Sequence, residues 1–269
     1  MSITHSAISS DRVDTVLGEL GLTGPFAQET YVKNMERQYG RKADRYMDAV
    51  DSAHSAEFSP ARWGNLYQLK NSDWRMSAYS SAHAYSPLYR AFLLWIAEHL
   101  DTQPARIVDL GCENGLLTLA MAKLMPNATL LGIERVPNAL AAARRRQTRH
   151  AVKNATFLRA DLSKPFDQVP PKSDLIIAAW VLHEILGTVR DGSDLGKGKG
   201  QFLQNLAEIA EPGTVLVSVN RFEYPEKEIP VLTEQLTFCG FCHIGESSIA
   251  ASEGDMISQF PIVCYEKTA

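Results

Sequence analysis

The sequence lacks any long hydrophobic run: none of the apolar stretches in its 269 residues approaches the roughly 18 residues that a membrane-spanning helix needs. Its first 14 residues also lack a basic start followed by an apolar stretch, so we expect no secretory signal and predict a cytoplasmic protein without a membrane partner. Neither sign of charge is in excess, since 27 basic and 31 acidic residues give a net charge of −4. Such a balance offers no field for holding a phosphate backbone, and nucleic acid is therefore not an expected partner.

Cysteine is scarce as well. Four cysteines in a chain of this length do not form a disulfide framework. The stretch Cys239-Gly-Phe-Cys242-His243 has the spacing of a haem attachment site or of half a zinc site. Haem attachment requires export, and no further pair of zinc ligands stands at suitable spacing. We therefore expect no metal, and a helix that ends at Gly240 and continues into a strand.

Residues 1–100 carry three of the four tryptophans, Trp63, Trp74 and Trp95, and few runs of β-branched residues. Apolar residues follow helical spacing over 31–50 and 87–100, with Pro87 suited to a first helical turn. The polar stretch 71–83 between them predicts an ordered loop. This part of the chain is predicted to be an α-helical cap or lid that contributes to an acceptor site.

Residues 101–269 alternate short apolar strands with amphipathic helices. This pattern predicts an α/β domain with a doubly wound, mostly parallel sheet of seven strands that ends in an antiparallel hairpin. The expected strands are 106–110, 129–133, 156–158, 174–179, 214–219, 241–247 and 257–265. The expected helices are 116–124, 138–150, 181–187, 201–210 and 226–238.

Two further segments have a biased composition. Residues 187–200 are rich in glycine and lysine but lack the spacing of a phosphate-binding loop, so a surface loop or an active-site lid is expected. The run Arg144-Arg145-Arg146 lies near a helix C-terminus, where basic residues suit the helix dipole, and a solvated face is expected.

Acidic residues follow three of the expected strands, and open α/β sheets bind ligands at the carboxyl ends of their strands. The first strand leads through Asp109 into a loop with Gly111 and Gly115, the second ends at Glu134, and Asp161 follows the third. Glu134 can accept both hydroxyls of a ribose. A carboxylate at Glu113 would repel a phosphate 4 Å away by about 4 kcal/mol at an effective dielectric near 20, which argues against a dinucleotide.

These residues resemble the class I S-adenosylmethionine-dependent methyltransferases, over about residues 105–266. The family loop usually reads D-x-G-x-G-x-G, so Asp109, Gly111 and Gly115 match it and Glu113 departs from it. The resemblance implies S-adenosylmethionine as cofactor, S-adenosylhomocysteine as product, Glu134 on the ribose and Asp161 on the adenine amine. It also implies cofactor contacts for the following residues: Cys112, Glu113, Arg135, Leu162, Ala179 and Trp180.

Structural roles remain open for the three acids. Asp109 and Asp161 could cap turns, and Glu134 could be a solvated charge before the next helix.

The acceptor side is expected at the end of the fourth strand. Trp180, His183 and Glu184 share one face if a helix begins there, and they suit a small aromatic or amine-bearing acceptor. His183 could act as a base, because its pKa lies near neutrality, or be a structural histidine. The cap offers further candidates: Arg75, Tyr79 and Tyr85 for binding the acceptor, and Tyr79 and His83 for catalysis.

The sequence thus predicts a methyltransferase that acts on a small molecule by in-line displacement, with no nucleic-acid partner. The Asn-Pro-Pro-Tyr stretch of amino-group DNA methyltransferases is absent after the fourth strand. A cyclase or aminocarboxypropyl transferase that uses the same cofactor, a nicotinamide-dependent oxidoreductase and a non-catalytic binding protein remain alternatives. The sequence leaves the acceptor's identity and the oligomeric state open, with a dimer among the options.

Overall fold

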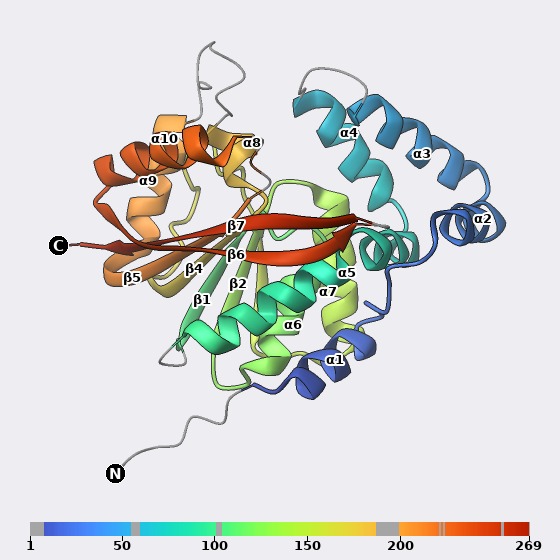
Figure 1. Ribbon diagram of the computed structural model, residues 1–269, viewed down its shortest axis with the longest axis horizontal. Coiled ribbons are helices and arrows are strands. Elements are labelled where there is room, and N and C mark those ends of the chain that lie inside the picture. Colours follow the sequence, from blue (N-terminus) through green and yellow to red (C-terminus); the bar gives the residue numbers. More distant parts are fainter. Residues whose placement is uncertain are drawn as a thin grey trace.

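The computed structural model describes residues 8–54, 60–100, 104–186, 199–220, 222, 224–253 and 256–268. A seven-stranded sheet forms its centre, in the order β3-β2-β1-β4-β5-β7-β6 (Figure 1). The strands are β1 (Arg106–Leu110), β2 (Thr129–Glu134), β3 (Ala155–Arg159), β4 (Ser173–Ala179), β5 (Ala210–Val219), β6 (Phe241–Glu253) and β7 (Met256–Lys267). Strands β1 to β5 pair in parallel, whereas β7 runs antiparallel to both β5 and β6. The expected α/β fold with its terminal hairpin is confirmed.

Helices cover both faces of the sheet because its strands are apolar on both sides. Ile107, Leu175 and Ile177 pack on one face and Val108 and Ile176 on the other, as the alternation of a strand requires. The first face is covered by α1 (Ser10–Glu19), α5 (Trp74–His99), α6 (Leu116–Leu124) and α7 (Pro137–Arg149). The second is covered by α8 (Leu182–Leu186), α9 (Lys199–Ile209) and α10 (Pro225–Phe238).

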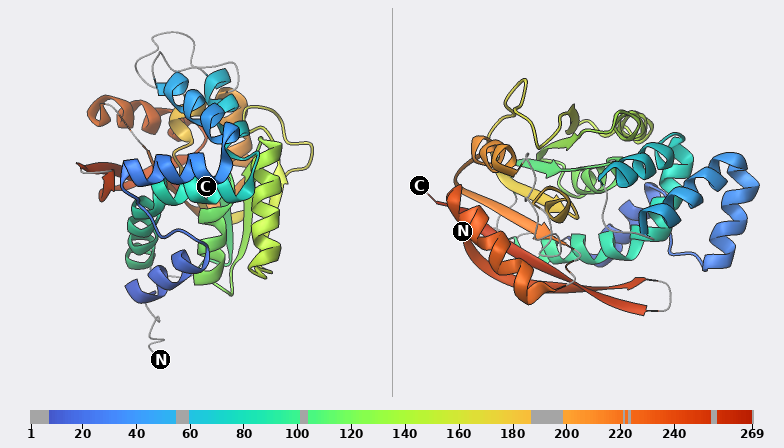
Figure 2. Two further views of the ribbon diagram at one scale, coloured as in Figure 1. Left: turned by 90° about the vertical axis from the view of Figure 1, so that its right-hand side faces the viewer. Right: turned by 90° about the horizontal axis from the view of Figure 1, so that it is seen from above.

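The N-terminal helices divide into two groups. Helix α1 and the second half of α5 pack against the sheet through Val13, Leu17, Phe92 and Ile96. Helices α2 (Gln28–Tyr39), α3 (Arg41–His54) and α4 (Pro60–Lys70) form a second cluster with the start of α5. Figure 2 shows this blue cluster to one side of the sheet. None of the described helices is long and apolar enough to span a membrane.

Residues 31–50 are helical as expected, in two helices with a break at Gly40. Two other expectations for this region were wrong. The expected loop at 71–83 is helical from Trp74 onward, because Asp73 caps α5 by accepting hydrogen bonds from the N–H groups of Arg75 and Met76. Pro87 consequently lies inside this helix and not in a first turn.

Small polar residues explain why α5 looked like a loop in the sequence. Ser77, Ser80, Ser81 and Ser86 are buried and bring the helix close to neighbouring backbone. The hydroxyl of Ser86, for example, donates to the carbonyl of Leu22 at 2.6 Å. Tertiary contacts therefore satisfy hydroxyls that would otherwise compete with the helix.

The remaining motifs have simple structural roles. Helix α10 ends at Phe238, and β6 begins at Phe241 just after Gly240, as expected. Across the described part of the chain, no three His, Cys, Asp or Glu side chains are placed to hold a metal ion. The glycine- and lysine-rich segment expected to be a loop or lid falls, over 187–198, outside the described residues.

Candidate functional site

The loop between β1 and α6 depends on two glycines. Gly111 has a φ of +68°, and a Cβ there would lie 2.7 Å from Cγ2 of Val181. Gly115 has a φ of +74°, and a Cβ there would lie 2.7 Å from Cβ of Ala143. Both the backbone conformation and the lack of space require glycine. The loop therefore turns tightly beside Val181, at the point between β1 and β4 where the strand order reverses.

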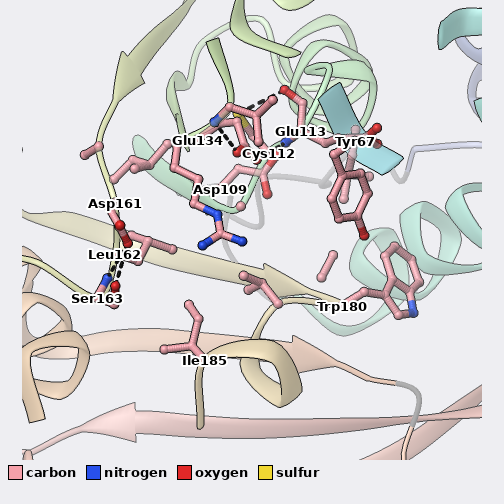
Figure 3. Close-up of a pocket in the computed structure, with 18 of the residues that line it drawn as sticks. Tyr67, Asp109, Cys112, Glu113, Glu134, Asp161, Leu162, Ser163, Trp180 and Ile185 are labelled. Atoms are coloured by element: carbon pink, nitrogen blue, oxygen red, sulfur yellow. Dashed lines mark hydrogen bonds between the residues drawn. The ribbon is translucent and has the colours of Figure 1, made fainter. Parts of the chain in front are cut away.

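A pocket of about 310 Å³ opens at the carboxyl ends of β1 to β4 (Figure 3). It brings together acids and loop residues expected from the sequence. These are Asp109, Gly111, Cys112, Glu113, Glu134, Arg135, Asp161, Leu162, Ala179 and Trp180. We call Asp109, Glu134 and Asp161 the acidic rim. Gly115 lies next to this set as the residue that precedes α6.

Glu134 is fixed by backbone donors. Its Oε1 accepts the N–H of Val136 at 2.7 Å, and its Oε2 accepts the N–H of Glu113 at 3.1 Å. Burial raises the pKa of Glu134, and these hydrogen bonds oppose the rise. Each oxygen keeps a further lone pair, so the carboxylate can accept two hydroxyl groups in a defined orientation.

Asp109 lies deeper and is fully buried. Its Oδ2 accepts the hydroxyl of Thr118 on α6. Burial, together with the charge of Glu134, raises the pKa of Asp109 to about 7. The acid thus links β1 to α6 and is partly protonated near neutral pH.

Asp161 follows β3 in a turn. Its Oδ1 accepts both the N–H of Ser163 at 3.0 Å and the hydroxyl of Ser163 at 2.6 Å. Partial burial acts to raise the pKa of Asp161, but these hydrogen bonds and the charges of Arg135 and Lys164 lower it overall. Asp161 therefore has the turn role that the sequence left open. The same hydrogen bonds fix the orientation of the carboxylate and hence the direction of its Oδ2.

Aromatic rings line the other side of the pocket. Tyr85 stacks on Trp180 at 6.1 Å between ring centroids, and Tyr89 lies 5.9 Å from the same indole. Trp180 has a φ of +58°, and its backbone N–H donates to Val219 at 2.8 Å. We call Tyr67, Tyr85, Tyr89 and Trp180 the aromatic wall. Tyr67 and Tyr89 were not anticipated, because nothing in the local sequence sets them apart from other helix tyrosines.

Three expected acceptor-side residues lie elsewhere. Tyr79 stacks on Phe26 at 4.7 Å, and His83 stacks on Tyr31 at 4.0 Å. Arg75 is exposed over the ring of Trp74. None of the three lines the pocket. Because α5 is one continuous helix, positions 79 and 83 share the face toward α2, whereas 85 and 89 turn toward the sheet.

His183 and Glu184 lie in α8, which follows the end of β4. Their side chains fall outside the described part of the structure.

Glu113 forms an ion pair that the sequence did not reveal. Nζ of Lys70, at the end of α4, lies 2.8 Å from Oε1 of Glu113, and both side chains are largely buried. Glu113 itself has a φ of +46°. Since Lys70 neutralises this carboxylate, the expected repulsion between Glu113 and a phosphate is weaker than the sequence suggested.

Arg146 is likewise not the solvated residue that the sequence led us to expect. It is 1% exposed, and it donates to the carbonyls of Asn114 at 2.9 Å and Trp74 at 2.6 Å. Burial lowers the pKa of Arg146 to about 10. Its neighbours Arg144 and Arg145 are exposed, as expected.

Comparison with known proteins identifies the domain around this pocket. Residues 101–220 match the family described as a methyltransferase domain. The release factor glutamine methyltransferase of Escherichia coli is 37% identical over 62 residues, which cover 23% of this chain and 22% of that protein. The trans-aconitate 2-methyltransferase of Methylobacterium nodulans is 39% identical over 80 residues, covering 30% of this chain and 28% of that protein. The chain thus spans about a quarter of the length of these curated relatives.

Solved structures share the fold over more of the chain. An O-methyltransferase from neocarzinostatin biosynthesis, in complex with S-adenosyl-L-homocysteine and 1,4-dihydroxy-2-naphthoic acid, has a TM-score of 0.56 and 19% identity, covering 84% of this chain and 70% of that one. An O-methyltransferase family protein from Burkholderia thailandensis has a TM-score of 0.54 and 12% identity, covering 89% and 72% of the two chains. The match to the methyltransferase domain family covers residues 101–220, and the chain has the Rossmann-like fold of the solved S-adenosylmethionine-dependent methyltransferases.

Proposed function

We propose that this chain, which carries a methyltransferase domain at residues 101–220, transfers a methyl group from S-adenosylmethionine to a small-molecule acceptor. The observation that carries the proposal is the carboxylate of Glu134. Two backbone N–H groups orient it at the end of β2, in a pocket whose opposite side is aromatic.

The donor set of the pocket fits this cofactor. Glu134 offers oriented acceptors for the two ribose hydroxyls, and Asp161 offers an acceptor for the adenine amine. Asp109 places a carboxyl group near the loop that favours a cationic amino acid moiety over a phosphate, whereas the carboxylate of Glu113 is already paired with Lys70. Cys112, Arg135, Leu162 and Ala179 complete the surface around the cofactor. When bound, S-adenosylmethionine supplies an electrophilic methyl group on a sulfonium.

The aromatic wall supports a planar acceptor. Tyr67, Tyr85, Tyr89 and Trp180 present ring faces and edges, which bind flat apolar groups and stabilise nearby cations. Helices α4 and α5, which supply the three tyrosines, cover the pocket and exclude water from the transfer. The neighbour from neocarzinostatin biosynthesis was solved with an aromatic compound, in agreement with an acceptor of this kind.

The chain contributes mainly by positioning. Holding the acceptor's nucleophile about 3 Å from the methyl group converts a bimolecular step into an effectively unimolecular one. A hydroxyl or ammonium acceptor also has to lose a proton, and we propose His183 as the base because α8 places it just after β4. Tyr79 and His83 are not proposed for this role, since both stack on Tyr31 of α2.

Binding and turnover test the proposal separately. Calorimetry should show binding of S-adenosylhomocysteine and much weaker binding of NAD; comparable affinities would favour the nicotinamide oxidoreductase. A metabolite panel incubated with S-adenosylmethionine labelled at the methyl group should then yield a labelled small molecule. Label on protein would instead point to a macromolecular acceptor, as the name of the release factor enzyme would suggest. Consumption of the cofactor without label transfer would favour a cyclase or an aminocarboxypropyl transferase.

With an acceptor in hand, His183→Ala tests the base. We expect kcat to fall by roughly 10²–10⁴ while the affinity for S-adenosylhomocysteine stays the same. An unchanged kcat would show that the acceptor needs no deprotonation by His183.

A further inference from the structure

The C-terminal end of α4 binds the loop after β1 through an ion pair and a hydrogen bond. Nζ of Lys70 lies 2.8 Å from Oε1 of Glu113, and Nδ2 of Asn71 donates to the same oxygen at 3.2 Å. The side chains of Lys70 and Glu113 are 4% and 15% exposed. Removing one partner of such a pair leaves an uncompensated charge away from water. The contact therefore constrains the loop and α4 relative to each other.

Glu113 also connects α4 to the acidic rim. The backbone N–H of Glu113 donates to Oε2 of Glu134 at 3.1 Å. Glu113 holds a φ of +46°, a conformation that a residue with a side chain adopts only when its surroundings impose it. Lys70 and Asn71 contribute to this constraint by binding the side-chain carboxylate of Glu113. A shift of Lys70 would thus be transmitted to the donor that orients Glu134.

Lys70 also touches the aromatic wall. Its Nζ lies 4.7 Å from the centroid of the Tyr85 ring, and that ring stacks on Trp180. Burial lowers the pKa of Lys70, whereas the carboxylate of Glu113 acts to raise it. One ammonium group thus lies between the loop on one side and the aromatic wall on the other.

A buried hydrogen-bond network keeps this junction in register. The hydroxyl of Ser77 donates to Oδ1 of Asn71 at 2.6 Å. Nδ2 of Asn114 donates to the hydroxyls of Ser77 and Ser81, at 2.8 and 2.9 Å. These groups come from the α4–α5 turn, from α5 and from the loop before α6. Because such networks have few alternative arrangements, movement of one member is costly for the others.

We propose that Lys70 is a positioning residue that couples the two sides of the pocket. It holds Glu113, and through it Glu134, in the orientation that the nucleoside requires, while its ammonium group fixes Tyr85 in the aromatic wall. The inference rests on the proposed function, and it adds a residue that no sequence motif marks.

The test uses the full chain and the variants Lys70→Met, Glu113→Gln and the double variant. Calorimetry measures binding of S-adenosylhomocysteine, and hydrogen exchange without ligand compares residues 110–117 with β5. We expect Lys70→Met to weaken binding about 10–100-fold and to speed exchange at 110–117 selectively. The double variant buries no unpaired charge but still lacks the contact between α4 and the loop, so its affinity should stay below that of the wild type. Lys42→Met, which breaks the exposed pair between Lys42 and Asp73 at the start of α5, is the matched control and should change neither.

The outcomes separate the two proposals. Wild-type affinity and loop exchange in Lys70→Met would overturn the positioning role, and so would faster exchange spread equally over loop and β5. If Lys70→Met does not fold, Glu113→Gln should still loosen 110–117, and no loosening there overturns the inference. Failure of the wild-type chain to bind S-adenosylhomocysteine would refute the proposed function, while the exchange data would still decide whether Lys70 orders the loop.

Discussion

The acidic rim and the aromatic wall of the pocket differ in what holds them. Each rim carboxylate is fixed by groups at the carboxyl edge of the sheet: Glu134 by backbone N–H groups, Asp109 by Thr118 and Asp161 by Ser163. The wall has no such local support. Its rings come from α4, from α5 and from the end of β4, and they meet only through tertiary packing.

The two sides should therefore respond differently to substitution. The rim depends on a few hydrogen bonds at the edge of a rigid parallel sheet, so single changes there should remove nucleoside binding. The wall depends on many contacts that each contribute a little. Single substitutions there should therefore have small effects, and these effects should be limited to binding of the acceptor. Lys70 is the exception, since it pairs with Glu113, whose N–H orients Glu134, and also contacts Tyr85.

The largest effect is expected for Glu134→Ala. It removes acceptors for two hydroxyls, each charge-assisted hydrogen bond being worth about 1.5–3 kcal/mol, so the affinity for S-adenosylhomocysteine should fall by about 3–6 kcal/mol. Calorimetry measures this loss. Glu134→Gln keeps one carbonyl acceptor and should lose less, and an unchanged dissociation constant in the alanine variant would place the ribose elsewhere.

The raised pKa of Asp109 predicts that the stability of the folded chain depends on pH. Its pKa rises from the ordinary 3.8 to about 7 in the folded chain, so folded Asp109 keeps a proton that the unfolded chain releases. This difference contributes up to about 4 kcal/mol to the free energy of unfolding. The contribution is complete below about pH 4 and is lost as the pH rises through 7.

Urea unfolding between pH 4 and 8 tests this, with Asp109→Asn as the neutral control. The difference in unfolding free energy between wild type and variant should shift against the wild type as the pH rises. A difference that is constant across this range would mean that Asp109 titrates alike in the folded and unfolded chains.

A smaller effect is expected for Tyr85→Leu in the aromatic wall. The loss of ring contacts with Trp180 and the acceptor should cost about 0.5–1.5 kcal/mol, seen as a rise in KM for the acceptor. Affinity for S-adenosylhomocysteine should stay within about threefold. An equal loss of both affinities would show that rim and wall are not separate subsites.

The smallest effect is expected for Tyr79→Phe. Its hydroxyl accepts a hydrogen bond from Asn34 at 3.1 Å, outside the pocket. We expect no change in kcat or KM and at most about 1 kcal/mol of stability, measured by urea unfolding. A fall in kcat would return Tyr79 to the catalytic role that its sequence position first suggested.

The sheet was largely predictable because its signals are local. The expected bounds of β1 and α6, 106–110 and 116–124, agree with the structure, since a buried apolar run ends at glycines before an apolar helix. The acids at the rim followed from strand ends alone, because parallel strands bring their carboxyl ends to one edge.

The helical region was less predictable for a physical reason. The serines of α5 favour loops by propensity, and only their burial against Leu22 and Asn114 makes a helix the better state. In a loop over 71–83, Tyr79 and His83 could have reached the pocket. The continuous helix turns them toward α2, while the expected Tyr85 and the unexpected Tyr89 line the pocket.

The alternation of strands and helices, the glycine loop and the three acids of the rim follow from the sequence alone, because each depends on neighbours in the chain or on the edge geometry that every parallel sheet shares. The aromatic wall, the burial of Arg146 and the pairing of Lys70 with Glu113 arise from tertiary packing. These depend on the way α4, α5 and α7 pack over the loop. An ion pair between a helix end and a distant loop has no periodicity that a sequence could display.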